Sequence, residues 1–138
     1  MSHDRPSWDD VWSDFASAIS NRSYDPRHKV GAIVVTSDNT SVLAIGYNGN
    51  YSGGPNAPES TVPGQSGFIH AEINALLKMD YSNYKRKIMY VTLSPCRACA
   101  KAIINAGISE VVYNNEYRDI SGVELMKSAG IVVRKYAR

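Results

Sequence analysis

Two short motifs hold the residue types of a metal-dependent hydrolase. Cys96 and Cys99 are the two cysteines of the chain, and His70 with Glu72 forms a second pair upstream. Residues three apart are neighbours on one helix, so the two thiols can hold one cation. The partial positive charge of a helix N-terminus favours thiolate, the form that binds metal. We therefore expect the cysteines to bind zinc, which soft sulfur ligands favour.

His70 would complete a set of one nitrogen and two sulfur ligands. Such a set leaves the fourth tetrahedral position to water, as catalytic zinc sites do. Zinc lowers the pKa of bound water to about 7, and a nearby carboxylate can accept that proton and pass it on. Glu72 is the candidate carboxylate. It lies about 200° around a regular helix from His70, so both reach one site only if His70 stands at the very start of the helix.

Each motif alone has a plainer interpretation. A Cys-x-x-Cys pair can be a redox pair or half of a structural zinc site, and a His-x-Glu pair is mostly a solvated helix start. A thiol redox protein would not need His70, and a non-catalytic zinc-binding module would not need Glu72. Together with Pro95, however, the motifs match the signature of zinc deaminases. On cytosine, water would attack C4 while Glu72 protonates N3 and then the departing ammonia.

The composition is that of one soluble domain. The 138 residues are 43% hydrophobic and 20% charged, with a net charge of +2. This is enough for one core, so we expect a single domain over residues 1–138. The low net charge predicts no nucleic-acid partner, which also counts against a tRNA adenosine deaminase, the nearest alternative. No apolar run is long enough to span a membrane, and residues 1–10 lack the pattern of a signal peptide. We expect a cytoplasmic protein.

Hydrophobic periodicity predicts elements that place both motifs at helix starts. A helix capped by Ser7 should be followed by an antiparallel hairpin, a long loop over residues 48–69 and three helix–strand alternations. We expect helices over 8–20, 70–79, 95–106 and 121–129, the last with a capping box of Ser121 and Glu124, and strands over 30–36, 41–47, 87–93, 109–114 and 131–136. This order predicts an α/β fold, a three-layer α/β/α sandwich with a five-stranded mixed sheet. Ligands collect at the carboxyl ends of such strands.

The sequence resembles the cytidine deaminase superfamily and, within it, the deoxycytidylate (dCMP) deaminases. The resemblance covers nearly the whole chain. It rests on Asn21-Arg22-Ser23, Val30-Gly31-Ala32, Gly46-Tyr47-Asn48-Gly49, His70-Ala71-Glu72-Ile73-Asn74-Ala75, Pro95-Cys96-Arg97-Ala98-Cys99 and Tyr117-Arg118. It implies a cytidine deaminase-like fold, a catalytic zinc and deamination of dCMP to dUMP, which supplies the precursor for thymidylate synthesis. Deamination of dCTP or of the free nucleoside remains an alternative.

The resemblance also implies roles in binding the substrate. Asn48 would contact the sugar or base, and Ala71 would offer backbone contacts to the pyrimidine. Arg27, Tyr117 and Arg118 are candidates for the 5′-phosphate end, because guanidinium groups suit phosphate. The arginines can also be ordinary solvated charges, and a turn role competes for Asn48.

Regulation and assembly are implied only by the resemblance. Members of this family are commonly homohexamers that dCTP activates and dTTP inhibits, with Mg²⁺ accompanying the triphosphate. Candidate residues for that allosteric site are Gly49, Asn50 and Gly54, although glycine can also serve turn geometry in a flexible loop. Many relatives carry a second, structural zinc in and around this loop. Here both cysteines are already used, so we expect one zinc per chain.

Overall fold

The computed structural model describes residues 5–138; residues 1–4, which belong to the segment expected to lack a signal peptide, lie outside it. The sheet has the strand order β2-β1-β3-β4-β5. In chain order the elements are α1 (Trp8–Ser20), β1 (Gly31–Thr36), β2 (Val42–Tyr47), α2 (Ala71–Lys78), β3 (Lys87–Leu93), α3 (Arg97–Asn105), β4 (Glu110–Asn115), α4 (Ser121–Ser128) and β5 (Val132–Lys135). Over residues 5–138, no helix combines the length and the apolar character needed to cross a bilayer.

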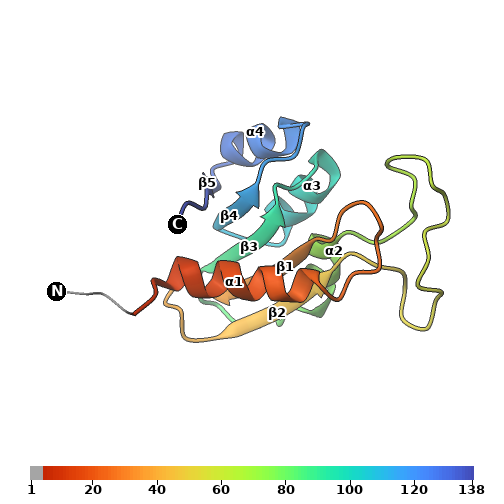
Figure 1. Cartoon of the computed structure of the whole chain (residues 1–138). Coiled ribbons are helices and arrows are strands. Elements are labelled where there is room, and N and C mark those ends of the chain that lie inside the picture. Colours follow the sequence, from red (N-terminus) through yellow and green to blue (C-terminus); the bar gives the residue numbers. More distant parts are fainter. Residues whose placement is uncertain (1–4) are drawn as a thin grey trace.

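Helices cover both faces of the sheet, as predicted. Helix α1 lies across one face, while α2 lies behind the sheet in the same view (Figure 1). The α1 side of the core contains Trp12, Ala16, Ile33, Val35, Ile88, Tyr90 and Val112. The other side is larger and includes Ala75 of α2, Ile103 of α3 and Met126 of α4. The predicted three-layer sandwich with a mixed five-stranded sheet is therefore confirmed.

Strand directions bring three loops to one edge of the sheet. Strand β1 is antiparallel to both β2 and β3, so β2 and β3 run in the same direction. Strand β4 is parallel to β3. The carboxyl ends of β2, β3 and β4 consequently meet at the edge where β1 begins. The chain leaves these three ends toward α2, α3 and α4, which places the starts of those helices near one another.

Two predicted helix starts differ from the structure. Helix α3 begins at Arg97 rather than at Pro95, because Cys96 keeps an extended backbone at the N-cap. The predicted capping box of Ser121 and Glu124 is wrong. Ile120 is the N-cap of α4 and makes no side-chain cap, and the Ser121 N–H instead donates to Asp119 Oδ1 at 2.9 Å. A local Asx turn therefore satisfies the end of this helix. The Ser7 cap of α1 is confirmed, since its Oγ accepts from the Asp10 N–H at 3.0 Å.

Helix α2 packs directly on the backbone of β2. A Cβ atom added at Gly46 would lie 2.5 Å from both the Ala71 carbonyl oxygen and the Ala75 nitrogen. Both atoms are main chain, so a side chain could be accommodated only if the helix moved. Because Ala71 stands between His70 and Glu72, this contact also sets the height of the candidate catalytic residues above the sheet.

We expect Gly46→Ala to lower the free energy of unfolding by about 2 kcal/mol or more, because the new methyl group overlaps backbone atoms. Chemical denaturation of the purified variant measures this change. Gly49→Ala is the matched control: its Cβ would make only ordinary contact with the Tyr47 ring, at 3.8 Å. Equal stability of the two variants would contradict a close contact at Gly46.

Candidate active site and metal centre

His70 and Cys96 both occupy N-cap positions. Each has an extended backbone, with φ −66° and ψ 152° at His70 and φ −71° and ψ 170° at Cys96. Neither side chain caps its own helix. The imidazole and the thiol are therefore free to reach across the gap between α2 and α3. The expectation that His70 stands at the very start of its helix is confirmed.

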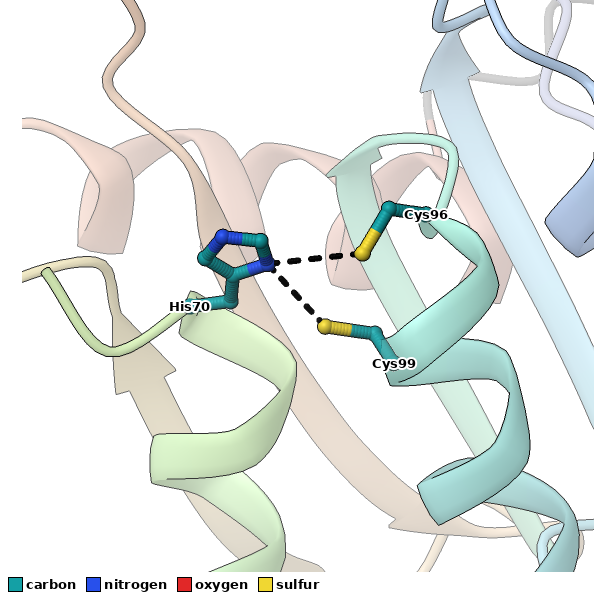
Figure 2. Close-up of side chains that lie close together, drawn as sticks. All are labelled: His70, Cys96 and Cys99. Atoms are coloured by element: carbon teal, nitrogen blue, oxygen red, sulfur yellow. Dashed lines mark hydrogen bonds between the residues drawn. The ribbon is translucent and has the colours of Figure 1, made fainter. Parts of the chain in front are cut away.

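Three donor atoms from these two helices converge (Figure 2). The His70 Nδ1 atom lies 3.1 Å from the Cys99 Sγ and 3.5 Å from the Cys96 Sγ. All three atoms lie within 4.8 Å of one another, and within residues 5–138 no other group of His, Cys, Asp or Glu meets this test. Tetrahedral zinc with ordinary bond lengths separates such ligand atoms by roughly 3.5 to 3.8 Å. The donor set therefore fits a zinc ion with little movement.

The thiols have opposite tendencies to ionise. Hydrogen bonds from the Cys99 thiol and from His70 lower the pKa of Cys96 to about 4. The pKa of Cys99 is raised, because its proton is held by Cys96 and its side chain is buried. The neighbouring Cys96 thiolate also raises the pKa of His70. Without metal, the cluster thus holds a thiolate that shares protons with its neighbours, which is suited to exchange them for a cation.

Glu72 is buried beside this cluster, with 4% of its surface exposed. Burial raises the pKa of its carboxyl group to about 7, although its own backbone N–H and the positive charge of His70 act in the opposite direction. A carboxyl group with a pKa near the working pH can both accept and donate a proton. Its position in the first turn of α2 places it next to the donor atoms while leaving it outside the group that could bind the metal.

A cavity of about 410 Å³ opens beside the cluster. It brings together the residues predicted for catalysis, metal binding and substrate binding: His70, Glu72 and Cys96 with Arg27, Asn48, Ala71, Tyr117 and Arg118. Cys99 lies behind them and is buried. Arg27 and Arg118 supply two guanidinium groups to the walls, and both residues are exposed. The cavity therefore combines a metal-binding wall with a cationic one.

Asn48 has internal partners for its whole amide group. Its Oδ1 accepts from the Val30 N–H at 2.8 Å, and its Nδ2 donates to Asp25 Oδ2 at 3.0 Å and to the His28 carbonyl at 2.8 Å. These bonds hold the segment that carries Arg27 against the start of β1. A contact from Asn48 to the sugar or base stays a prediction. The structure adds that Asn48 positions the wall of the cavity.

Sequence reasoning missed other residues of the cavity wall. Asp25 was one of them, and it accepts hydrogen bonds from the backbone N–H groups of Arg27 and His28. The Asp-Pro dipeptide at this point is a turn signal that could have identified it. No comparable signal marks Phe68, Ser94 or Glu116, which also line the cavity.

The allosteric candidates lie in a separate pocket of about 270 Å³. Gly49, Asn50 and Gly54 line it together with Arg22 and other residues of the long loop. The ends of that loop are joined by hydrogen bonds in both directions between Gly49 and Ile69, at 3.1 and 2.8 Å. Asn48 and Phe68 line both pockets. The two pockets are thus neighbours with a shared wall.

Comparison with known proteins agrees with this geometry. The sequence pattern of the family described as "Cytidine and deoxycytidylate deaminase zinc-binding region" matches residues 6–115. The deoxycytidylate deaminase of Homo sapiens is 34% identical over 142 residues, covering 94% of this chain and 79% of the human protein. That of Mycobacterium phage D29 is 38% identical over 127 residues, covering 81% of this chain and 98% of the phage protein.

A solved structure is similar over almost the whole fold. The dCMP deaminase of the cyanophage S-TIM5, in complex with dCMP and dUMP, superposes with a TM-score of 0.80. It is 35% identical and covers 97% of this chain and 100% of that one. The match includes the elements that build the cavity, since it extends over nearly all of both chains.

We expect His70→Ala and Cys99→Ala to lose stoichiometric zinc, because each removes one of the three converging donors. Elemental analysis of protein freed from loosely bound metal measures the zinc content. His28→Ala is the matched control: this histidine lines the same cavity but stands outside the donor cluster. Retention of one zinc by Cys99→Ala would contradict the ligand set.

Proposed function

The chain belongs to the cytidine and deoxycytidylate deaminase family, and from that membership we propose that it is a zinc-dependent enzyme that hydrolyses dCMP to dUMP and ammonia. One observation supports this most strongly. The buried Glu72 carboxyl group and the His70, Cys96 and Cys99 donors lie against one cavity whose walls also carry two arginines. The pyrimidine and the phosphate of one nucleotide require these two kinds of wall.

His70, Cys96 and Cys99 would hold the zinc ion. A zinc ion in such a site supplies a Lewis acid that makes water nucleophilic near neutral pH. With both cysteines in this set, we propose one zinc per chain. The long loop that holds a second zinc in many relatives is closed here by the Gly49–Ile69 bonds and by the Glu59 N–H, which donates to the Ser66 carbonyl at 2.7 Å.

Glu72 would move the protons of the reaction. Hydrolysis adds water at C4 of cytosine, breaks the bond to the exocyclic amine and leaves a carbonyl group. Glu72 would accept a proton from the attacking water and deliver it to N3, and would then protonate the departing ammonia. A pKa raised to about 7 by burial supports this double role, because the group can be loaded and unloaded at neutral pH.

The cationic wall would bind the phosphate. Arg27 and Arg118 can present paired N–H donors to phosphate oxygens. Tyr117 lies beside Arg118, whose guanidinium carbon is 6.0 Å from the centre of the ring. Ala71, in the first turn of α2, would offer backbone contacts to the pyrimidine, and Asn48 would stand near the sugar. These roles favour a nucleotide over a free nucleoside.

Regulation and assembly belong to the same proposal. The second pocket, with Gly49, Asn50 and Gly54, would bind dCTP as activator and dTTP as inhibitor, with Mg²⁺ on the triphosphate. Its shared wall with the catalytic cavity supports such a coupling, because a change at Asn48 or Phe68 would reach both ligands. We propose a single cytoplasmic domain that assembles as a homohexamer and supplies dUMP for thymidylate synthesis.

We expect Glu72→Gln to keep zinc and to lose about 100- to 10,000-fold in kcat, because the amide cannot carry the proton. Rates of dUMP formation and zinc content are measured on the same preparation. The variant keeps the size of the side chain, so a loss of zinc would indicate damage to the cluster rather than loss of proton transfer. Near-normal turnover with zinc bound would exclude the role assigned to Glu72.

Ammonia release from the zinc-loaded protein tests the substrate. We expect turnover of dCMP to exceed that of deoxycytidine, dCTP and a tRNA substrate, with dCTP raising the rate on dCMP and dTTP lowering it. Turnover without a response to either triphosphate would retain the enzyme and reject the allosteric site. Faster turnover of deoxycytidine than of dCMP would reject the phosphate-binding role of the arginines.

A further inference from the structure

The segment between β4 and α4 carries the Arg118 side of the cavity. It runs from Glu116 to Ile120, and its first three residues line the cavity. The segment between β3 and α3 carries Cys96 on the metal-binding side. These two segments follow neighbouring parallel strands, and the structure attaches one to the other at two points.

Ser94 makes the first attachment. The residue is 3% exposed, and its Oγ accepts a hydrogen bond from the Tyr117 N–H at 2.6 Å. Its own backbone N–H donates to the Asn115 carbonyl at 2.8 Å. The β3–β4 pairing ends at Leu93 and Asn115. Ser94 thus extends the contact between the strands beyond the sheet and into the loop that carries Arg118.

Gly122 makes the second attachment, at the far end of the same loop. A Cβ atom at this position would overlap the Pro95 carbonyl oxygen and would lie 2.7 Å from the carbonyl carbon of Cys96. The first turn of α4 therefore rests directly on the backbone of a candidate metal ligand. Since these are main-chain atoms, neither side can shift alone.

The two attachments fix the distance between the two ends of the cavity. Arg118 is held to one side of the Ser94–Cys96 segment and the donor cluster to the other. A nucleotide in the cavity has its amine-bearing ring at the cluster and its phosphate at the arginines. Correct spacing lets both ends bind at once, whereas a loose loop would lose the phosphate contact and keep the ring contact.

We propose that Ser94 is a positioning residue for phosphate recognition: its hydroxyl group holds the Tyr117–Arg118 backbone at the height at which Arg118 meets the substrate phosphate. The inference rests on the proposed function, because it requires a nucleoside monophosphate in the cavity. It assigns to Ser94 no contact with substrate. Its effect should therefore depend on the presence of the phosphate and should leave the donor cluster unchanged.

The test compares the affinities of zinc-loaded protein for dUMP and deoxyuridine, two ligands that differ only in the phosphate. We expect Ser94→Ala to weaken dUMP binding about tenfold and deoxyuridine binding less than about twofold, as expected for one lost hydrogen bond that orients a loop. Calorimetric titration gives both affinities, and elemental analysis should find unchanged zinc. Ser94→Thr, which keeps the hydroxyl group, should restore the preference for dUMP.

Ser13→Ala is the matched control. Ser13 is also buried, at 2% exposed, but lies in α1, and its Oγ has no hydrogen-bond partner among the described residues. This variant should bind both ligands like the unchanged protein. Gly122→Ala attacks the same loop from its other end and should also reduce the preference for dUMP, so the inference can be tested if Ser94→Ala does not fold.

Equal weakening of both ligands by Ser94→Ala would show a merely structural role and overturn the inference, as would an intact preference for dUMP. Both outcomes leave the proposed function standing if the unchanged protein prefers dUMP. If the unchanged protein shows no such preference, the phosphate-binding part of the proposed function fails as well. The unchanged protein therefore separates the two failures.

Discussion

Close contact between main-chain atoms at three glycines holds the functional parts of this protein in place. At Gly31 a Cβ atom would overlap the backbone of α1, at Gly46 that of α2, and at Gly122 that of the Pro95–Cys96 segment. In each case the neighbour is a backbone atom that no side-chain rotation can move. The distance between the layers is therefore set by peptide groups in contact, which are much less adaptable than side chains.

The electrostatics of the site follow from this close packing. Glu72 is buried because α2 lies so near β2, and its burial raises its pKa to about 7. The same geometry brings His70 to the thiols, which lowers the pKa of Cys96. A carboxyl group that can carry a proton and a thiolate ready for metal are thus two results of one arrangement. Both would be weakened by a small outward movement of α2.

The division of the cavity into a metal-binding wall and a cationic wall suits a substrate with two unlike ends. The donor cluster lies at the starts of α2 and α3, and Arg118 lies on the loop that leads to α4. Parallel strands β3 and β4 place these loops side by side. This is the common use of carboxyl strand ends in α/β proteins, where several loops contribute to one site. Here the long loop adds a neighbouring pocket that shares Asn48 and Phe68 with the cavity.

Much of this could be predicted from the sequence because the signals are local. Helix α1 and strand β3 have the predicted bounds, and Cys96, Cys99, His70 and Glu72 were recognised by residue type and spacing. Local signals also have limits: the Asx turn at Asp119 replaced the predicted capping box, and Cys96 proved to be an N-cap. Only the tertiary structure decided that Asn48 supports the wall with its whole amide group, and that Ser94 holds Tyr117. The reason is physical: helix caps and motif spacing depend on neighbours within a few residues, whereas these bonds join segments 18 to 23 residues apart, which meet only when the sheet has formed.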